Sequence, residues 1–363
     1  MAYEIDAVGS TATEKDYDAW CFRYVYEGHS HICVYDGGTA EVGDDLSKHL
    51  RKYYTNGTND GVEMAICSHS DTDHSSGLRS ILENFNVKYL VMNRPWLYID
   101  ELHKKLLDDS ITKEKLEKKL REQYPFIDEL EKIANKRGTT ILQGLQGEQP
   151  LPGMRIMSPT KSFYLDCIAK SDKTPDMKSS AVNSNTSILA KLAATAKNWL
   201  VAIWGVDNIK EGVTTTPENE SSIIIKVKPT NENPFLLVGD AGCESLGCAL
   251  DYGNLLGEPL SECDFLQIPH HGGRHNVSPS ILNKLIGPMI SQEAASTKTA
   301  FVSVSKNSDH PKKCVTNAFI NRGCAVYISS TNTIWHHSGD VKDRGWGKAT
   351  KVEFSHKVES WDE

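Results

Sequence analysis

The sequence of 363 residues has no long apolar run and no excess of positive charge. No window approaches the roughly 18 uninterrupted apolar residues of a transmembrane helix, and the start, "MAYEIDAVGS", lacks the basic residues and apolar core of a signal peptide. The formal net charge of −8 argues against a protein that binds nucleic acid over its whole surface, since such a surface must be positive. We therefore expect a cytoplasmic protein with no membrane partner, although metals and local basic residues could still make one site positive.

The sequence also lacks a pattern of paired cysteines. Nine cysteines are an odd number, and the closest pair, Cys243 and Cys248, has no second pair that would complete a four-ligand zinc site. Several cysteines fall inside apolar runs, which predicts buried free thiols of a reducing compartment rather than a disulfide framework. These are Cys33, Cys67, Cys263 and Cys324.

Strand-like apolar runs alternate with helical patterns along most of the chain, which predicts an α/β protein. "CFRYVYEG" and "HICVYDGG" are typical of a hairpin. Residues 97–137 are charged and helical and predict an inserted helical pair. The segment "TKEKLEKKLREQ" of this pair is either a solvated face or a surface that binds a polyanion. Residues 170–183 predict a polar loop. The apolar stripe expected for the helical pair consists of Leu106, Leu107, Leu116 and Leu120.

The stretch "AICSHSDTDHSSGL", residues 65–78, holds four strongly hydrated side chains where a strand gives way to a helix. Extended backbone repeats its side-chain direction every two residues, so His69, Asp71 and Asp73 can share a face, and His74 can turn inward. Four ligands within six residues are too many for one tetrahedral zinc, and two metals about 3.5–4 Å apart fit better. The plainer interpretation is a polar loop that caps the next helix.

Three further polar positions also follow strand-like runs directly. They are Asp36 after "ICVY", Asp240 after "FLLVG" and the pair His270-His271 after "LQIP". Side chains at strand ends, on loops held by a rigid sheet, are where catalytic constellations are usually built. Together with residues 69–74 they favour a metal centre over unrelated polar loops. Asp240 is the natural bridging carboxylate, and one of the two histidines would complete the second metal.

At this point the motifs resemble a known family. "SHSDTDHSSG" resembles the HxHxDH signature of the metallo-β-lactamase superfamily, with Asp71 in place of the second histidine. The HxDxDH form is similar to the C-terminal hydrolase domain of the DNA-uptake protein ComEC and its soluble relatives. The order of "ICVYDGG", "FLLVGDAG", "LQIPHHGG" and "SDHPKK" agrees with this resemblance.

The resemblance implies a four-layer αββα metallo-β-lactamase sandwich with two divalent metals, zinc or manganese, at one edge. It implies a single domain over residues 1–363, with a helical insertion near 97–140 and a loop-rich insertion near 160–220. One metal would be held by His69 and Asp71 and the other by Asp73 and His74, with Asp240 as the bridge. The remaining ligand would be His271, although the sequence leaves open which of His270 and His271 ligates.

Other residues receive roles from the same resemblance. Asp36 would orient a metal ligand from behind, and Asp73, His270 and His310 are candidate catalytic residues. His310 is either a phosphate contact or acid, or a residue at a helix start next to Pro311. Substrate contacts are expected from Arg274 and Lys306.

The chain departs from the family pattern in ways that bear on metal and substrate. A further histidine ligand, common in the superfamily before the bridging aspartate, has only His103 as a counterpart, inside an expected helix. The first metal would then have two carboxylate ligands, which favours manganese there. The membrane channel that delivers DNA is absent from the sequence, so the channel's function is not inherited.

The leading functional prediction is a metal-dependent phosphodiesterase, most plausibly a nuclease, in which a dinuclear centre turns water into an attacking hydroxide. The alternative is a hydrolase of a small phosphodiester, such as a cyclic nucleotide or phosphocholine-type ester, or of a lactone. The third interpretation is a signalling or scaffold protein with structural metals. A protein partner that delivers the substrate is compatible with the inserted helices, but no residue identifies it.

Overall fold

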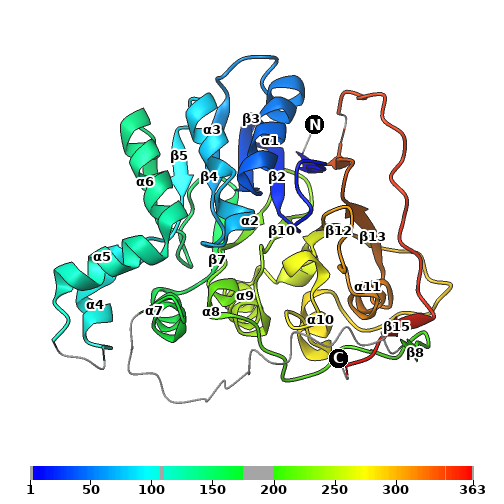
Figure 1. Ribbon diagram of the computed structural model, residues 1–363. Coiled ribbons are helices and arrows are strands. Elements are labelled where there is room, and N and C mark those ends of the chain that lie inside the picture. The colour runs from blue at the N-terminus through cyan, green and yellow to red at the C-terminus, as the bar shows by residue number, and fades with distance from the viewer. Residues whose placement is uncertain (1–2, 107–109, 175–198, 340, 362–363) are drawn as a thin grey trace.

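The computed structural model describes residues 3–106, 110–174, 199–339 and 341–361 (Figure 1). Its strands are β1 (Tyr3–Ala7), β2 (Ala19–Tyr26), β3 (His29–Gly37), β4 (Val62–Ile66), β5 (Tyr89–Val91), β6 (Thr140–Leu142), β7 (Met154–Ser158), β8 (Trp199–Val201), β9 (Ile224–Val227), β10 (Phe235–Leu237), β11 (Phe265–Gln267), β12 (Lys298–Ser303), β13 (Cys324–Ser329), β14 (Ile334–Ser338) and β15 (Lys357–Glu359).

The helices lie between these strands. The α-helices are α1 (Ala40–Tyr53), α2 (Thr72–Ser75), α3 (Leu78–Asn84), α4 (Ile99–His103), α5 (Lys113–Gln123), α6 (Pro125–Arg137), α7 (Lys161–Lys170), α8 (Pro217–Glu220), α9 (Cys243–Leu255), α10 (Pro279–Leu285) and α11 (Lys313–Ile320). Short 3₁₀ turns are η1 (Pro95–Tyr98), η3 (Leu260–Glu262) and η4 (His270–Gly272).

Two large sheets form the centre of the molecule. One has the strand order β14-β1-β2-β3-β4-β5-β6, and the other has the order β13-β12-β11-β10-β9-β7. A small third sheet pairs β15 with β8 near the C-terminus. Strands β3 to β6 are mutually parallel, and so are β10 to β13, so the carboxyl ends of several strands in each sheet point the same way.

The two sheets face each other across an apolar core. Phe235 of the second sheet packs against Tyr3 and Phe22 of the first, with ring centroids 5.1 and 5.3 Å apart. A separate apolar cluster joins α1, α3 and α6 to the outer face of the first sheet, and another joins α9, α10 and α11 to the outer face of the second. Figure 1 shows these helices on opposite sides of the paired sheets. The predicted α/β class with αββα layers is therefore confirmed.

The predicted hairpin is present as β2 and β3. Tyr26 pairs with His29, and the two residues between them, Glu27 and Gly28, have φ angles of 46° and 82°. Two consecutive positive φ angles are typical of a type I′ turn, whose twist matches that of the flanking strands. Glycine at the second position makes this turn accessible.

The charged stretch after residue 97 is helical, as predicted. Leu106, Leu116 and Leu120 are buried, whereas Leu107 lies outside the described residues. Arg121 of α5 forms ion pairs with Glu117 of the same helix and with Asp128 and Glu131 of α6. Such pairing within α5 and α6 fits the solvated-face interpretation better than a surface that binds a polyanion. The boundaries of both insertions stay predictions, and residues 175–183 of the expected loop lie outside the described part.

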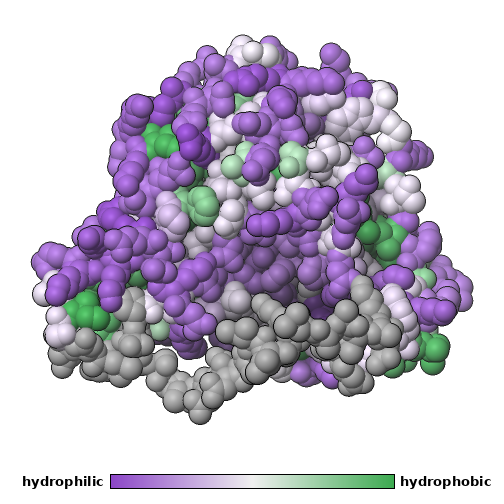
Figure 2. Space-filling model, in the orientation of Figure 1, coloured by the Kyte–Doolittle hydropathy of each residue, from purple (hydrophilic) through white to green (hydrophobic). Residues whose placement is uncertain are grey.

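All nine cysteines are free thiols in the structure, and seven of them are buried. The face turned to the viewer in Figure 2 is mostly hydrophilic, with apolar side chains in small separate patches. Among the residues that the structure describes, none of the helices combines the length and apolar character that crossing a membrane requires.

We predict that Phe235→Ala destabilises the fold, because it removes the ring that joins the two sheets. The free energy of unfolding should fall by about 3–5 kcal/mol, as for other fully buried phenylalanines. Leu255→Ala is the control, since the Leu255 side chain is 82% exposed, and it should change stability by less than about 0.5 kcal/mol. Urea denaturation of both variants measures this, and equal losses would contradict the core assignment.

Candidate metal centre

The polar residues singled out in the sequence meet at one edge of the sandwich. Residues 69–74 follow β4, Asp240 follows β10 and the pair His270-His271 follows β11. Because β3 and β4 run parallel in one sheet and β10 and β11 run parallel in the other, their carboxyl ends reach a common edge. We call the six predicted ligands the edge cluster: His69, Asp71, Asp73, His74, Asp240 and His271.

Close backbone packing holds the first of these loops in place. The N–H of Gly77 donates to the carbonyl of Gly38 at 2.9 Å, and a Cβ atom at Gly77 would lie 1.9 Å from the carbonyl oxygen of Gly37. No side chain fits there, so glycine is required. The contact fixes α2 and the start of α3 against the end of β3, and with them the histidine and aspartates before Gly77.

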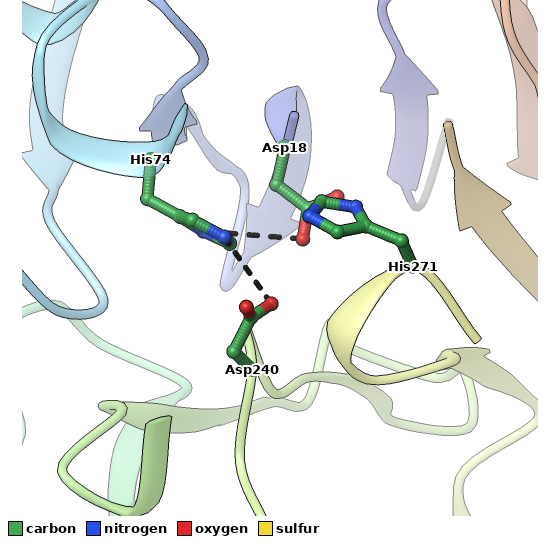
Figure 3. Close-up of side chains that lie close together, drawn as sticks. All are labelled: Asp18, His74, Asp240 and His271. Carbon is green, nitrogen blue, oxygen red and sulfur yellow. Dashed lines mark ion pairs between the residues drawn. The ribbon is translucent and has the colours of Figure 1, made fainter. Parts of the chain in front are cut away.

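Asp240 lies between the two halves of the edge cluster. Its Oδ1 is 3.2 Å from Nε2 of His74 (Figure 3). Its Oδ2 is 4.0 Å from Nε2 of His69. Asp73 lies on the other side of His74, with its Oδ2 3.9 Å from His74 Nε2 and 3.4 Å from His271 Nε2. The structure thus brings both histidines of the first motif, Asp240 and His271 to one point.

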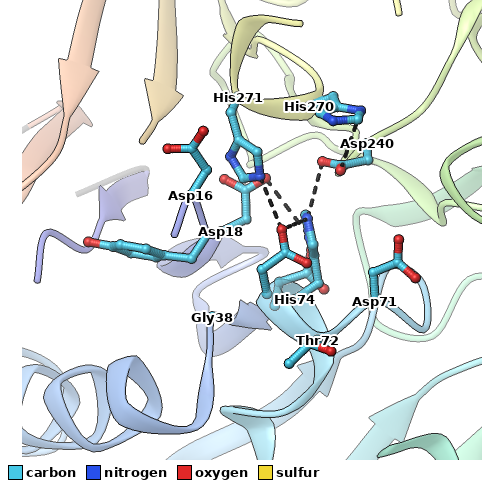
Figure 4. A network of polar contacts seen from close by, with 12 residues as sticks. Asp16, Asp18, Gly38, Asp71, Thr72, His74, Asp240, His270 and His271 are labelled. Atoms are coloured by element: carbon cyan, nitrogen blue, oxygen red, sulfur yellow. Dashed lines mark hydrogen bonds and ion pairs between the residues drawn. The ribbon is translucent and has the colours of Figure 1, made fainter. Parts of the chain in front are cut away.

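Asp71 lies at the side of the cluster opposite Asp16 (Figure 4). Its Oδ2 is 3.7 Å from His69 Nε2, while its Oδ1 accepts a hydrogen bond from Lys173 Nζ at 2.7 Å. Burial would raise the pKa of the Asp71 carboxyl, but the neighbouring His69 and Lys173 hold it well below its usual range. Sequence reasoning missed Lys173, because nothing marks one lysine of the polar stretch "KSDKTPDMKSS".

Three histidines are held from behind by hydrogen bonds at Nδ1. His74 Nδ1 donates to Asp36 Oδ2 at 2.9 Å, and His271 Nδ1 donates to the carbonyl of Ser303 at 2.9 Å. The Nδ1 atom of His69 lies 3.0 Å from Ser68 Oγ. Asp36, predicted to orient a ligand, also accepts from the N–H and hydroxyl of Ser68 at 2.7 and 2.6 Å. Such contacts fix the ring orientation and leave the opposite nitrogen facing the cluster.

The atoms that face the cluster fit divalent metals. The Nε2 atoms of His69, His74 and His271 and the Oδ1 atom of Asp240 are buried without a hydrogen-bond partner. Buried polar atoms are normally paired, so four unpaired ones in one place point to a missing partner. Imidazole nitrogens with carboxylate oxygens are a donor set that zinc and manganese both accept.

The backbone at η4 sends the two adjacent histidines in different directions. His270 and His271 have φ angles of 48° and 53°, a left-handed conformation that costs a non-glycine residue about 1–2 kcal/mol. Their rings stand at 83° to each other. His271 is buried and points into the cluster, whereas the side chain of His270 is 31% exposed at the rim. Geometry therefore favours His271 as the ligand.

The charges of the cluster shift the pKa values of its members. Burial would lower the pKa of His74, but Asp240, Asp36 and Asp73 raise it well above its ordinary value. The pKa of His271 is raised to about 10 by Asp73 and other nearby carboxylates, against the effect of burial. Burial lowers the pKa of His270. Without metal, the cluster therefore keeps protons on His74 and His271.

A seventh residue, Asp18, was not singled out from the sequence. Asp18, His74, Asp240 and His271 each offer one ligand atom, and these atoms all lie within 4.8 Å of one another (Figure 3). Asp18 comes from the loop before β2, and its oxygens accept from Trp20 Nε1 and Gln267 Nε2, both at 2.9 Å. In the sequence, Asp18 stands in "KDYDAW", directly before a strand. The other candidate residues were found because they directly follow a strand.

The remaining predicted residues lie at or beyond the rim. His310 is half-buried after β12, and its Nδ1 donates to Asp16 Oδ2 at 3.0 Å. Lys306 is exposed on the same loop. Arg274 is directed elsewhere: its Nη1 donates to the carbonyl of Ser360 at 2.6 Å, and its guanidinium covers the ring of Trp361. The predicted substrate contact of Arg274 is therefore not supported.

A second buried group, Asp6, Cys21 and His49, differs from the edge cluster in having partners. Asp6 accepts from His49 Nε2 at 2.9 Å and Tyr54 at 2.8 Å, and Arg344 donates to both of its oxygens. The positive charge that a metal would bring is already present as Arg344. None of these three side chains is among the buried atoms without a partner.

The chain is similar in structure to several solved proteins of low sequence identity. Yeast PDE1 shares 13% identity, with 91% of this chain and 97% of that chain covered and a TM-score of 0.40. Metallo-β-lactamase SMB-1 shares 8% identity over 77% and 88% of the two chains, with a TM-score of 0.31. A metallo-β-lactamase from Cronobacter sakazakii with a HARLDQ motif shares 7% identity over 72% and 76%, with a TM-score of 0.31. No family profile and no curated protein matches the sequence. The fold class therefore rests on the layers of the structure itself.

We predict that zinc or manganese raises the melting temperature of protein that has been stripped with a chelator. Metal that binds only the folded state should add about 2.7 kcal/mol at a hundred times its Kd, a shift of a few degrees. Asp240→Asn should lose most of this shift, and Asp251→Asn, on the exposed face of α9, should keep it. Equal shifts in both variants, or none in the wild type, would contradict a shared site.

We also predict that metal-free protein loses stability as the pH rises from 7 to 8. The raised pKa values of His74 and His271 mean that the folded state binds more protons than the unfolded state in this window. The free energy of unfolding should then fall by about 1.4 kcal/mol per pH unit for each extra proton. Urea titrations with and without metal measure this slope. The metal-loaded protein should show a smaller slope, because metal replaces the protons, and a rising metal-free curve would contradict the assignment.

Proposed function

We propose that the chain is a metal-dependent phosphodiesterase of the metallo-β-lactamase superfamily. The observation that carries this proposal is the set of four buried atoms without hydrogen-bond partners on His69, His74, Asp240 and His271. These atoms belong to the residues that the HxDxDH motif and its later partners would contribute. The resemblance to ComEC-type hydrolase domains remains part of the proposal and rests on the motifs alone.

The residues of the edge cluster divide naturally into two sets. His69 and Asp71 would hold one divalent metal, Asp73, His74 and His271 would hold the other, and Asp240 would reach both. Bound metals would lower the pKa of water to near 7 and stabilise negative charge that develops on a phosphoryl group. The carboxylate-rich first set favours manganese over zinc on that side. The hydrogen bond from Lys173 to Asp71 would compete with a metal there.

The open rim supports an enzyme over a scaffold. Structural metal sites are closed, whereas catalytic ones keep an accessible position. The side chains of Asp71 and Asp73 are 33 and 31% exposed, although His69, His74 and His271 behind them are almost fully buried. A substrate could therefore reach the carboxylate side of the cluster from solvent.

Nucleic acid is the substrate class that the sequence favours, and a small phosphodiester is the alternative. Lys306 and His310 lie on one loop beside the site and could contact a phosphate backbone. Arg274, however, is bound to Ser360 and Trp361, and the net charge is −8. Both observations favour a small substrate, because they weaken the expected attraction for a long polyanion.

The test is hydrolysis of a panel that contains single- and double-stranded DNA and RNA, cyclic nucleotides and bis(p-nitrophenyl) phosphate, with zinc or manganese. We expect cleavage of at least one phosphodiester, and a loss of at least about a hundredfold in Asp240→Asn, since its carboxylate serves both metal sets. Asp251→Asn should retain full activity.

The outcomes separate the two substrate classes. Cleavage of nucleic acid supports the nuclease, and cleavage confined to small esters supports the alternative. Turnover that survives Asp240→Asn would come from a contaminant or from another site, and it would end the proposal. So would the absence of turnover in protein whose metal content has been verified.

A further inference from the structure

Two histidines, His270 and His310, stand at the rim of the edge cluster without belonging to it. Their side chains are 31 and 28% exposed, and their ring centroids lie 6.2 Å apart. They come from different loops, η4 and the segment between β12 and α11. Neither contributes a buried nitrogen without a partner. Their position suits contact with a bound ligand rather than with a metal.

The ring of His310 is oriented by a carboxylate. Asp16 Oδ2 lies 3.0 Å from His310 Nδ1 and also accepts from the hydroxyl of Ser308 at 2.6 Å. Asp16 Oδ1 accepts from the N–H of Ser305 at 2.8 Å. A carboxylate surrounded by donors remains an acceptor, so His310 Nδ1 must carry a hydrogen. The Nε2 atom of His310 is left to exchange a proton with a ligand.

The ring of His270 is oriented by an amide group. This amide donates a hydrogen bond to the ring, whereas the carboxylate beside His310 accepts one. Asn219 Nδ2 donates to His270 Nδ1 at 2.6 Å and also contacts Thr215 Oγ1 at 2.8 Å. Asp240 Oδ2 lies farther from the same nitrogen, at 3.6 Å, which is beyond hydrogen-bond distance. A neutral imidazole that accepts at Nδ1 carries its hydrogen on Nε2. The left-handed backbone of His270 is held by its N–H, which donates to the carbonyl of Gly239 at 3.2 Å. His270 therefore presents a fixed N–H donor.

We propose that Asn219 and Asp16 are positioning residues that give His270 and His310 opposite hydrogen-bonding polarity toward one phosphodiester. His270 donates its Nε2–H to a non-bridging phosphoryl oxygen. His310, in the form that carries hydrogen on both ring nitrogens, transfers the proton of Nε2 to the leaving ester oxygen while the bond from phosphorus to that oxygen breaks. The oxygen of water forms the new bond to phosphorus, and the proton that water releases returns to His310 Nε2. This inference rests on the proposed phosphodiesterase function.

The two positioning residues should affect turnover in different ways. Proton transfer to the leaving group matters most when that group is a poor one, and general acid catalysis contributes typically 10²–10⁴-fold. Asp16→Asn should therefore lower kcat about tenfold or less on p-nitrophenyl esters and a hundredfold or more on phenyl or alkyl esters. Asn219→Asp, which accepts instead of donating, should lower turnover of all esters by a similar factor.

The experiment measures kcat against the leaving-group pKa for a series of aryl methyl phosphates in wild type and both variants. His310→Ala should reproduce the steepened dependence of Asp16→Asn, and His270→Ala should reproduce the uniform loss of Asn219→Asp. Asp251→Asn and Asn254→Asp, both on the exposed side of α9, are the matched controls and should match wild type. An unchanged leaving-group dependence in Asp16→Asn would overturn the inference.

A second measurement does not depend on turnover. Long-range ¹H–¹⁵N spectra of histidine-labelled, metal-loaded protein report which ring nitrogen carries hydrogen. We expect hydrogen on Nε2 alone for His270, hydrogen on Nδ1 for His310 with or without a second one on Nε2, and a switch of His270 in Asn219→Asp. Hydrogen on Nδ1 of His270 in the wild type, or a His310 ring without hydrogen on Nδ1, would overturn the inference. Correct forms in a protein that hydrolyses no phosphodiester would sink the proposed function and leave the polarity assignment standing.

Discussion

Imidazole nitrogens and a carboxylate oxygen buried together without hydrogen-bond partners are the constraint on which the rest of the site depends. An unsatisfied buried polar group costs about 1–3 kcal/mol, so the four atoms on His69, His74, His271 and Asp240 favour the binding of cations. In metal-free protein, the ion pairs of His74 with Asp240 and of His271 with Asp73 offset part of this cost. The fold nevertheless holds the three rings firmly from behind. Two cations that share these atoms between them would convert this cost into binding energy.

The same fold shows what happens when a buried acidic group has its cation built in. Asp6 meets His49 and Tyr54, and Arg344 from the C-terminal segment neutralises it between aromatic rings. The Asp6 carboxylate is therefore buried with all its charge paired. The edge cluster has the opposite character, because parallel strands of two sheets deliver its residues to an edge that stays open to solvent through Asp71 and Asp73. The Asp6 group is therefore a structural ion pair, whereas the edge cluster, at the open edge of the two sheets, can accept ligands.

The sequence predicts the residues that follow strands and misses those that do not. Residues 69–74, Asp240 and His270-His271 could be grouped because each comes directly after an apolar run, and the structure brings them together. Asp16 and Asp18 precede a strand, and Asn219 lies in a short helix, so no periodic pattern marks them. The choice between His270 and His271 depends on two left-handed residues, which adjacent letters do not reveal. The substrate contact of Arg274 stays a prediction, and its position in the motif did not indicate the hydrogen bond that it donates to Ser360.

Anomalous diffraction from crystals grown with manganese or zinc tests the central claim most directly. The account predicts anomalous peaks within bonding distance of His74, Asp240 and His271, with a weaker peak beside His69 and Asp71. Peaks at Asp6 and His49 alone, or an edge cluster that stays free of metal in crystals soaked well above micromolar concentration, would contradict it.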